Sequence, residues 1–574
     1  GANKLFNDRW SATAVLLPKI ASDYKSISGK DIQFGAIGIM KYKKSDNKNF
    51  KFGLYYNSEL FGPFFVPMIG MYYLSPNKKF AAITNNGQST QGIHLVDIAK
   101  QTILDYATTP KSWYGLSFSA DNQFLYASGG NDNWILKYAI VSNKLKLVDS
   151  IKLGGKWPVR ISPTGLCIND ATNTMYVVSK ENNSLYEVNL TTKNFVADPL
   201  GSEAYTCLLS ADKKQLYISL WGKDQLLIWD TETKQSTKKL AIGDNPNELL
   251  LTKNGSYLYV ANANDNSVAV VDTKTLNIVE VLNCALFANA PNGSTTNGLA
   301  LNEAESRLYV ANADNNNLAV FDVTKKGFSS SIGFIPTGWY PTNLKIVGNT
   351  LFVTNGKGLS SKANPNGPNP IQRKQTVNYQ AGDVKAKPAP IEYIGGLFKG
   401  TLSIFKEPTT AELISLTKQV YLNTPYNKNK ELSTSGMQGN PIPKNVGDSS
   451  PIKHVFYMIK ENRTYDQVLS DLPQGNGDSS LLLFGRNITP NQHAIAEQFV
   501  LLDNFYVDAE VSADGHSWSM GAYANDYNEK TIVGFMSFSV MSIAALADVA
   551  TGIMGQQLVI SDTIFNSFVI IVLG

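Results

Sequence analysis

The stretch LYVAN at residues 258–262, followed by a polar turn and the run SVAVVDTKT, occurs a second time at residues 308–312. There it is followed by NLAVFDVTK. Weaker copies of the same pattern lie on both sides of this pair. Aligned on their second residue, the copies start at positions 82, 126, 176, 217, 259, 309 and 352. The chain therefore repeats one unit at steps of 41 to 50 residues.

Each copy contains an apolar run, an Asn/Asp/Gly turn, a second alternating run and a third run after Thr or Lys. The apolar spacing is two rather than 3.6, which favours strands over stacked helices. The turns at residues 264–266 and 314–316 suit tight hairpins, because Asn tolerates a positive φ. Short strands at a period in the forties are typical of four-stranded propeller blades. The sequence therefore predicts a mainly β fold with a seven-bladed β-propeller.

These repeats resemble the YVTN/YncE-like β-propeller family over residues 75–425, through the Tyr-Val-Ala/Thr-Asn signature and the following Val-Asp-Thr strand. We assign residues 1–425 to this domain. Residues 357–399, rich in Pro, Gly and Lys, form a long insertion in the last blade, whose later strand resumes at 400–405. Residues 1–74 carry no clear repeat and are a candidate source of the strand that closes the ring.

Composition excludes several classes of protein. Of 574 residues, 43% are apolar and 17% are charged, which rules out a disordered or collagen-like chain. The net charge of +4 is too small for a dedicated nucleic-acid binder. A propeller fold dictates no ligand, so a scaffold or a docking surface for a protein partner is the default expectation.

The chain has three cysteines, Cys167, Cys207 and Cys284. Their spacing fits no zinc pattern and their number is odd, so we expect buried free thiols. The start at Gly1-Ala2 has neither Met nor a basic-then-apolar leader, which leaves export open.

Residues 451–530 follow a polar linker (426–450) and differ in charge from the rest. They hold eleven acidic and five basic residues, a net charge of −6. Three of the four histidines, His454, His493 and His516, lie there as well. Carboxylates and imidazoles are ligands for divalent cations. An acidic surface with incidental histidines explains the same composition.

The order of elements in this segment suggests an α/β domain. An apolar run at 454–459 is consistent with a buried parallel strand that ends at Glu461-Asn462. In open α/β sheets, ligands bind at the carboxyl ends of strands. A helix is predicted over 489–499 with Pro490 early in it, and a strand over 501–507.

The run from IKHVFYMIKENRTYDQVL to VSADGHSWS resembles the start of the phosphoesterase family of the alkaline phosphatase superfamily. A propeller followed by this segment resembles the bifunctional YncE-like/alkaline phosphatase-like proteins of bacteria. The resemblance implies that Glu461 and Asn462 are the first metal ligands, for zinc or another divalent cation. It also implies that Ser512 is the nucleophile and that His516 contacts phosphate or metal, with Thr464 a weaker alternative nucleophile.

Physical chemistry is compatible with these roles, since a helix dipole and a metal both favour an ionised hydroxyl. Each residue also has a structural interpretation. Glu461 and Asn462 could cap a helix, and Ser512 could be an ordinary N-cap. His454 is expected to be structural, and His493 is expected to be a surface residue.

The family's remaining ligands, an Asp pair and histidines, have no counterpart in residues 531–574. That stretch contains no Lys, Arg or His. Residues 532–554 are long enough to span a bilayer, but Asp548 weakens that interpretation, and a truncated or shifted end explains the change equally well. Association with a membrane stays open.

Two functions follow as expectations. The first is a metal-dependent phosphoesterase that hydrolyses a phosphate ester through Ser512, fused to a binding propeller and incomplete in this chain. The bacterial resemblance implies a periplasmic, secreted or outer-membrane-associated protein. The alternative is a non-catalytic propeller scaffold of a cell-envelope complex.

Overall fold

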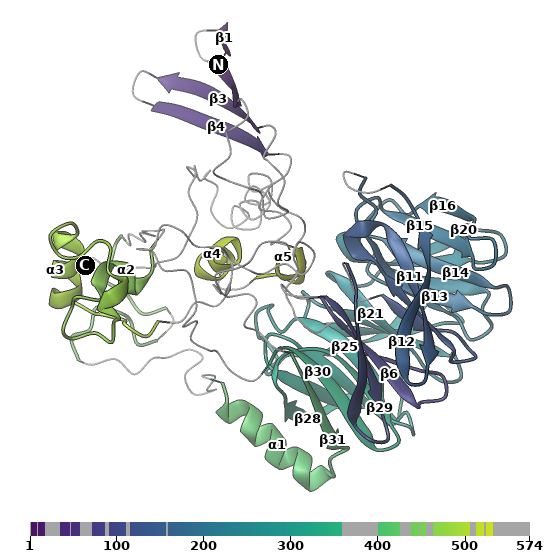
Figure 1. Cartoon of the computed structure of the whole chain (residues 1–574). Helices are drawn as coiled ribbons and strands as arrows, with labels where there is room; N and C mark the ends of the chain where they lie inside the picture. The colour runs from purple at the N-terminus through teal and green to yellow at the C-terminus, as the bar shows by residue number, and fades with distance from the viewer. Residues whose placement is uncertain are drawn as a thin grey trace.

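The computed structural model describes most of the propeller and parts of the segments around it (Figure 1). The described residues are 2–7, 10–17, 35–45, 48–57, 72–86, 91–110, 115–155, 159–358, 400–424, 438–445, 447–454, 463–505, 512–521 and 524–531. All statements below concern these residues.

Eight antiparallel sheets occur in this part of the chain, and seven of them are the blades of one propeller. The first three blades comprise β5 (Tyr72–Leu74), β6 (Phe80–Asn85), β7 (Gly92–Asp97), β8 (Thr102–Thr108), β9 (Leu116–Phe118), β10 (Phe124–Ser128), β11 (Trp134–Val141), β12 (Lys144–Lys152), β13 (Pro163–Asn169), β14 (Thr174–Ser179), β15 (Ser184–Asn189) and β16 (Phe195–Pro199). Blades four and five comprise β17 (Cys207–Leu209), β18 (Gln215–Leu220), β19 (Gln225–Asp230), β20 (Gln235–Ala241), β21 (Pro246–Leu251), β22 (Tyr257–Asn262), β23 (Ser267–Asp272) and β24 (Asn277–Asn283). Blades six and seven comprise β25 (Thr296–Leu301), β26 (Arg307–Asn312), β27 (Asn317–Asp322), β28 (Ser330–Pro336), β29 (Trp339–Val347), β30 (Thr350–Gly358) and β31 (Thr401–Lys406).

The seven sequence copies form the second strands of the seven blades. Positions 82, 126, 176, 217, 259, 309 and 352 fall in β6, β10, β14, β18, β22, β26 and β30. The predicted seven-bladed β-propeller is confirmed. The first strand of each blade lies upstream of its copy, where the sequence shows no repeated motif.

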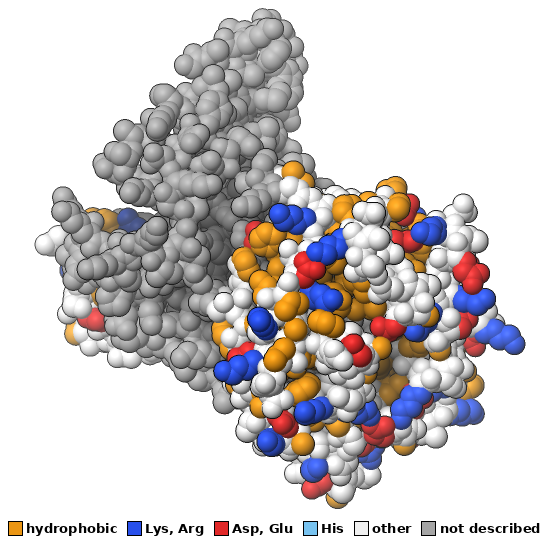
Figure 2. All heavy atoms as spheres, turned by 45° about the vertical axis from the view of Figure 1, so that its right-hand side comes forward, with side chains coloured by type: hydrophobic (Ala, Val, Ile, Leu, Met, Phe, Trp, Pro, Cys, Tyr) orange, Lys and Arg blue, Asp and Glu red, His pale blue; other side chains and the backbone are white. Residues whose placement is uncertain are grey.

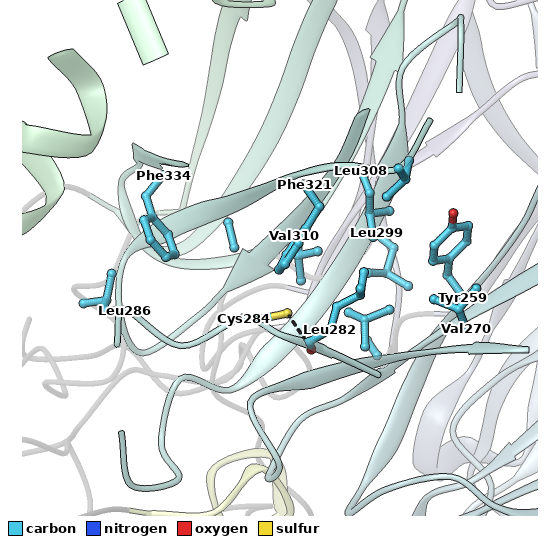
Figure 3. Close-up of a cluster of buried hydrophobic side chains, with 14 of the residues drawn as sticks. Tyr259, Val270, Leu282, Cys284, Leu286, Leu299, Leu308, Val310, Phe321 and Phe334 are labelled. Atoms are coloured by element: carbon cyan, nitrogen blue, oxygen red, sulfur yellow. Dashed lines mark hydrogen bonds between the residues drawn. The ribbon is translucent and has the colours of Figure 1, made fainter. Parts of the chain in front are cut away.

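Apolar side chains from neighbouring blades pack together to hold the ring. Figure 3 shows one such cluster, in which Tyr259 and Val270 of blade five meet Leu308, Val310 and Phe321 of blade six. Leu308 and Val310 are fully buried. Because the strand pattern alternates, each second strand supplies side chains to the cores on both of its sides.

The Asn/Asp turns have a second structural role. Asn266 adopts a left-handed φ of 51°, which completes the hairpin between β22 and β23. Its side-chain Oδ1 accepts hydrogen bonds from the backbone N–H groups of Gly293 and Ser294, at 3.2 and 2.7 Å. Asn133 does the same for Ile161 and Ser162. The turn of one blade thus fixes the loop that leads into the next.

Of residues 1–74, the described part of the chain gives the propeller the first strand of blade one, β5, and gives no strand to blade seven. Strands β1 (Ala2–Asn7), β2 (Trp10–Leu17), β3 (Gly35–Ser45) and β4 (Lys48–Asn57) form a separate sheet. Blade seven consists of β29, β30 and β31, and β31 lies where the interrupted strand was expected to resume. The rest of the insertion, 359–399, lies outside the described residues.

Helix α1 (Thr410–Leu422), which the sequence interpretation missed, covers the outer strand of blade six (Figure 1). It begins with a capping box between Thr409 and Glu412. Leu413 and Val420 are buried against the blade cores. The Thr417 hydroxyl accepts a hydrogen bond from Phe334 N–H at 2.9 Å. Covering an edge strand protects its unpaired backbone groups.

The secondary-structure elements described from residue 451 onward are all helices. They are α2 (Tyr465–Leu469), the 3-10 helix η5 (Ser479–Leu481), α3 (Pro490–Gln498), α4 (Ser512–Gly521) and α5 (Asp526–Thr531). Helix α3 confirms the predicted helix with Pro490 in its first turn. The strand predicted over 501–507 is wrong for residues 501–505, which form no strand. Leu502 and Phe505 are more than half exposed, and no described strand lies beside them to pair with.

The expected surface position of His493 is also wrong. Its side chain is completely buried, with Nε2 2.6 Å from Asp471 Oδ1 and Nδ1 2.8 Å from the Thr489 carbonyl oxygen. The imidazole therefore joins α3 to the end of α2. Most of the predicted strand at 454–459 lies outside the described residues, as does the apolar stretch 532–574. None of the helices described is long and apolar enough to cross a bilayer.

Candidate functional site at one face of the propeller

One face of the propeller is built from two kinds of loop. In an antiparallel blade, the second strand ends and the first strand begins at the same end of the sheet. The loops between second and third strands therefore lie beside the loops that lead from one blade into the next. We call this end the loop face. Propellers bind ligands at such ends of the central channel because several blades meet there.

Helix α5 lies against the loop face (Figure 1), close to β21 and β25. It meets side chains from blades four to seven. These are Tyr205 before β17, Trp221 in the 3-10 helix η2 (Trp221–Lys223), Asn264 in the turn after β22, Asn297 in β25, Tyr340 in β29 and Lys357 in β30. We call these six residues the α5 seat.

Asp526 is the first residue of α5 and is completely buried. Trp221 Nε1–H donates to Asp526 Oδ2 at 2.8 Å. Asp526 N–H donates to Asn264 Oδ1 at 2.9 Å. Trp221 thus donates a hydrogen bond to the Asp526 carboxylate. Asn264 accepts one from the backbone amide of Asp526, a group that has no partner within the helix because it lies at the helix start.

Lys530 lies one turn further along and is 5% exposed. Its Nζ is 2.6 Å from Asp526 Oδ1 and donates to Asn297 Oδ1 at 2.7 Å. The same ammonium lies 4.8 Å from the centre of the Tyr205 ring, a cation–π distance. A buried ammonium is costly unless it is paired and hydrogen-bonded, and here it has three partners.

Glu529 occupies the other side of the seat and is also 5% exposed. Burial raises the pKa of its carboxyl to about 8, and nearby Asp314 adds to the increase. Lys357 Nζ, 3.9 Å from Glu529 Oε1, offsets part of it. The phenol of Tyr340 is buried near these acids, and burial followed by Glu529 holds its pKa well above the ordinary value. At neutral pH the Glu529 carboxyl is therefore mostly protonated.

Further acids lie beside Asn264 on the same face. Asn264 Nδ2–H donates to Asp244 Oδ1 at 3.3 Å, and Asp244 N–H donates to Asp265 Oδ2 at 2.7 Å. Burial, then the charge of Asp224, raises the pKa of Asp244 to about 6. Figure 2 shows that basic and acidic side chains intermingle on the side of the propeller that it presents, without one dominant sign.

The chemistry of the α5 seat is recognition by hydrogen bonds and charge. It combines an indole N–H for a carboxylate, amide oxygens for donors and a ring for a cation, and Lys357 lies beside the buried carboxyl of Glu529. The seat therefore suits a ligand segment that carries both a carboxylate and an ammonium group. No His, Cys, Asp and Glu side chains among the described residues gather in a group of three or more that could hold a metal ion.

The residues singled out from the sequence have separate outcomes. Glu461 and Asn462 lie outside the described residues. Thr464 is exposed and precedes α2, without a side-chain hydrogen bond to that helix. Ser512 is the first residue of α4, and His516 follows within the same helix. The side chains of these last two are not described, so their proposed catalytic roles stay predictions.

Sequence reasoning missed the α5 seat. Asp526 and Lys530 have the i, i+4 spacing of a helical ion pair, which gives a weak signal for a short helix. Trp221 is the only aromatic residue at its position in the seven copies. Nothing in the pattern indicated that these two signals, 305 residues apart, belong to one contact.

Two family models match parts of the chain. The model described as "Lactonase, 7-bladed beta-propeller" matches residues 199–361, and the one described as "Domain of unknown function (DUF6268)" matches residues 3–112. All six residues of the α5 seat fall within the lactonase match. The match supports the propeller fold, and no curated protein matches the chain.

Solved structures with partial likeness include a chain of Kuenenia stuttgartiensis hydrazine synthase, 15% identical with a TM-score of 0.44. That alignment covers 51% of this chain and 93% of the other. A protein from Lactobacillus plantarum is 15% identical with a TM-score of 0.41, covering 58% and 98%. U3-55K is 14% identical with a TM-score of 0.42, covering 52% and 94%.

Proposed function

We propose that the propeller is a binding module whose loop face holds the α5 segment of a phosphoesterase-like region. The observation that carries this proposal is the buried Asp526–Lys530 ion pair against Trp221 and Asn297. A short helix has little stability of its own, so α5 depends on this contact for its structure. In this proposal the propeller positions the region that follows it.

The contact requires particular chemical partners. These partners come from several blades, and Asp526 and Lys530 each meet groups of complementary chemistry. Removing one partner of a buried ion pair costs about 3–5 kcal/mol in other proteins, because the remaining charge is left uncompensated. In this chain the free-energy cost of removing Asp526 or Lys530 has an upper limit, because α5 can leave the seat and expose the remaining charge to water.

The test is Asp526→Ala in the full chain, measured by hydrogen exchange at residues 524–531. We expect loss of amide protection in α5, with the propeller strands unaffected. Glu232→Ala is the matched control, because that side chain is 68% exposed and pairs only across the surface with Lys214. Unchanged protection in Asp526→Ala would contradict the proposal.

For the region that α5 belongs to, we propose metal-dependent hydrolysis of a phosphate ester. The support is the sequence resemblance over residues 451–530, with Ser512 as nucleophile and Glu461 and Asn462 as first metal ligands. The position of Ser512 at the start of α4 is compatible with this role, since the helix dipole favours an anion there. Metal ions would stabilise charge on the phosphoryl group. The periplasmic, secreted or outer-membrane location stays part of the same proposal.

The assay is hydrolysis of an aryl phosphate by the natural full-length protein loaded with zinc or another divalent cation. We expect activity that a chelator removes, and that Ser512→Ala and Glu461→Ala abolish. Thr464→Ala tests the weaker alternative nucleophile and should leave activity intact. If the metal-loaded protein is inactive while α5 stays docked, the non-catalytic scaffold is the correct function.

A further inference from the structure

Two of the three thiols lie against each other near the channel. Cys167 belongs to β13 and Cys207 to β17, the first strands of blades three and four. Their Sγ atoms are 3.6 Å apart. Since the two strands belong to neighbouring blades, the fold itself brings together residues that are 40 positions apart in sequence.

The surroundings of the pair are apolar on one side and polar on the other. Cys207 is 5% exposed and packs in the core between blades three and four, while Cys167 is half-buried at the edge of that core. Burial, then Glu248, then Cys207 and Cys167 raise the pKa of the Tyr73 phenol, which belongs to the first strand of blade one. Strands of three blades therefore converge at this point.

We propose that Cys167 and Cys207 are a cross-linking site, which a small disulfide reagent oxidises to a disulfide that joins blades three and four. A disulfide needs sulfur atoms about 2.05 Å apart, so the pair must close by roughly 1.5 Å. The proposal requires rotation of the two side chains, which lie on the neighbouring strands β13 and β17, to supply this movement.

The chemistry balances with a small disulfide such as oxidised glutathione as the oxidant. The Cys167 thiol, the more exposed of the two, loses its proton, attacks the reagent disulfide and releases one glutathione thiolate. The Cys207 thiol then loses its proton and attacks Cys167 Sγ, releasing the second thiolate. The two cysteines lose two protons and two electrons, and the reagent becomes two thiols.

We expect the disulfide to form slowly, because of the surroundings of the Cys207 thiol. The hydrogen bond with Cys167, followed by burial, raises the pKa of the Cys207 thiol, which lowers the fraction present as thiolate. The third thiol, Cys284, is an internal control, because it is fully buried in a different core and has no cysteine beside it among the described residues.

The experiment compares the full chain after oxidised glutathione and after dithiothreitol, by alkylation under denaturing conditions and mass spectrometry. We expect the alkylated thiols to fall from three to one, a loss of 2 Da before alkylation, and a peptide linking residues 167 and 207. Cys284→Ser should leave that cross-link intact. Cys167→Ser should abolish it and leave Cys207 alkylated.

Two results would overturn the proposal. One is a stable glutathione adduct on Cys167 with Cys207 still reduced, which would mean that the strands cannot close the distance. The other is a cross-link that includes Cys284 or a second chain, which would mean that the chain unfolds before it reacts. Circular dichroism before and after oxidation shows whether the chain keeps its fold while the disulfide forms.

Discussion

The blades and the α5 seat use opposite means to bring distant parts of the chain together. Between blades five and six, the contact is apolar, and Leu308 and Val310 have no exposed surface. At the seat, the buried groups are charged, and Asp526 and Lys530 need particular donors and acceptors. Apolar packing tolerates many partners of the right size, whereas a buried ion pair has few acceptable ones. The first kind of contact builds the ring, and the second selects what binds to it.

We expect the largest change in the free energy of unfolding from a substitution in the apolar core between blades five and six. Leu308→Ala removes a fully buried side chain from the core between blades five and six, and we expect a loss of about 2–5 kcal/mol in the free energy of unfolding. Chemical denaturation measures it. Val281→Ala in β24 is the control, because Val281 is 58% exposed and should change stability by about 0.5 kcal/mol or less. Equal effects would mean that the blades do not depend on this core.

The next effect is the pH dependence of α5 docking. The pKa of Glu529 is about 8 in the seat, against an ordinary value of 4.5. The docked state therefore holds a proton that the released segment gives up, so this carboxyl favours docking fully below pH 4.5. Its contribution decreases as pH rises and is lost above pH 8. Hydrogen exchange of α5 across this range should show protection falling with pH.

Glu529→Gln is the matched variant for that measurement. The amide has nearly the same shape but does not titrate, so the pH slope should flatten while docking persists above pH 8. Asp314 and Lys357 face the same carboxyl and keep their charges in the variant. A slope that survives in Glu529→Gln would assign the pH dependence to another group of the seat.

The Asn turns offer a test within the blades. Asn266→Gly keeps the left-handed backbone but removes the bonds to Gly293, Ser294 and Pro291, and we expect a loss of about 1–3 kcal/mol. Asn266→Ala adds the strain of a left-handed alanine, roughly 1–2 kcal/mol more. Thermal or chemical unfolding of both variants separates the two contributions. If Asn266→Gly is as stable as the unchanged chain, the turn needs only the left-handed backbone conformation and not the side-chain hydrogen bonds.

An effect of similar size, but confined to α5, is expected from Trp221→Phe. The substitution keeps an aromatic ring but removes the N–H that donates to Asp526, a bond to a charged group worth about 1.5–3 kcal/mol. Amide exchange in α5 should accelerate by roughly tenfold or more, with little change in the unfolding of the blades. Unfolding of the whole propeller in this variant would show that Trp221 belongs to the core rather than to the seat.

The same contrast explains how far the sequence could predict the structure. The strand period, the Asn turns and the seven copies are local signals, and the structure follows them. Some first strands were too short to give a period-two signal, since β9 and β17 have three residues each. Helix α1 was detectable from its Thr409-x-x-Glu412 capping box, but its neighbouring strand, β28, lies far from that motif in sequence.

The site was less predictable than the fold. Periodicity specifies which residues are buried in an element, but it does not pair Trp221 with Asp526 or Tyr205 with Lys530. His493 shows the same limit. A lone histidine on a polar helix suggests exposure, and only its partner Asp471, 22 residues away, explains its burial. Charged groups can be buried where a partner exists, and the partner is a property of the tertiary structure.

The smallest effect in this comparison belongs to an ion pair that resembles the buried one but lies at the surface. Arg486 bonds Glu497 through both guanidinium nitrogens, yet their side chains are 48% and 33% exposed. Water and salt already solvate both charges, so Glu497→Gln should leave the unfolding midpoint nearly unchanged and any shift should vanish in high salt. Asp526→Asn removes one charge of an ion pair as well, but from a side chain with no exposed surface, and should release α5 at any salt concentration. Equal responses of the two variants would mean that burial does not distinguish these pairs, and that the seat holds α5 by shape alone.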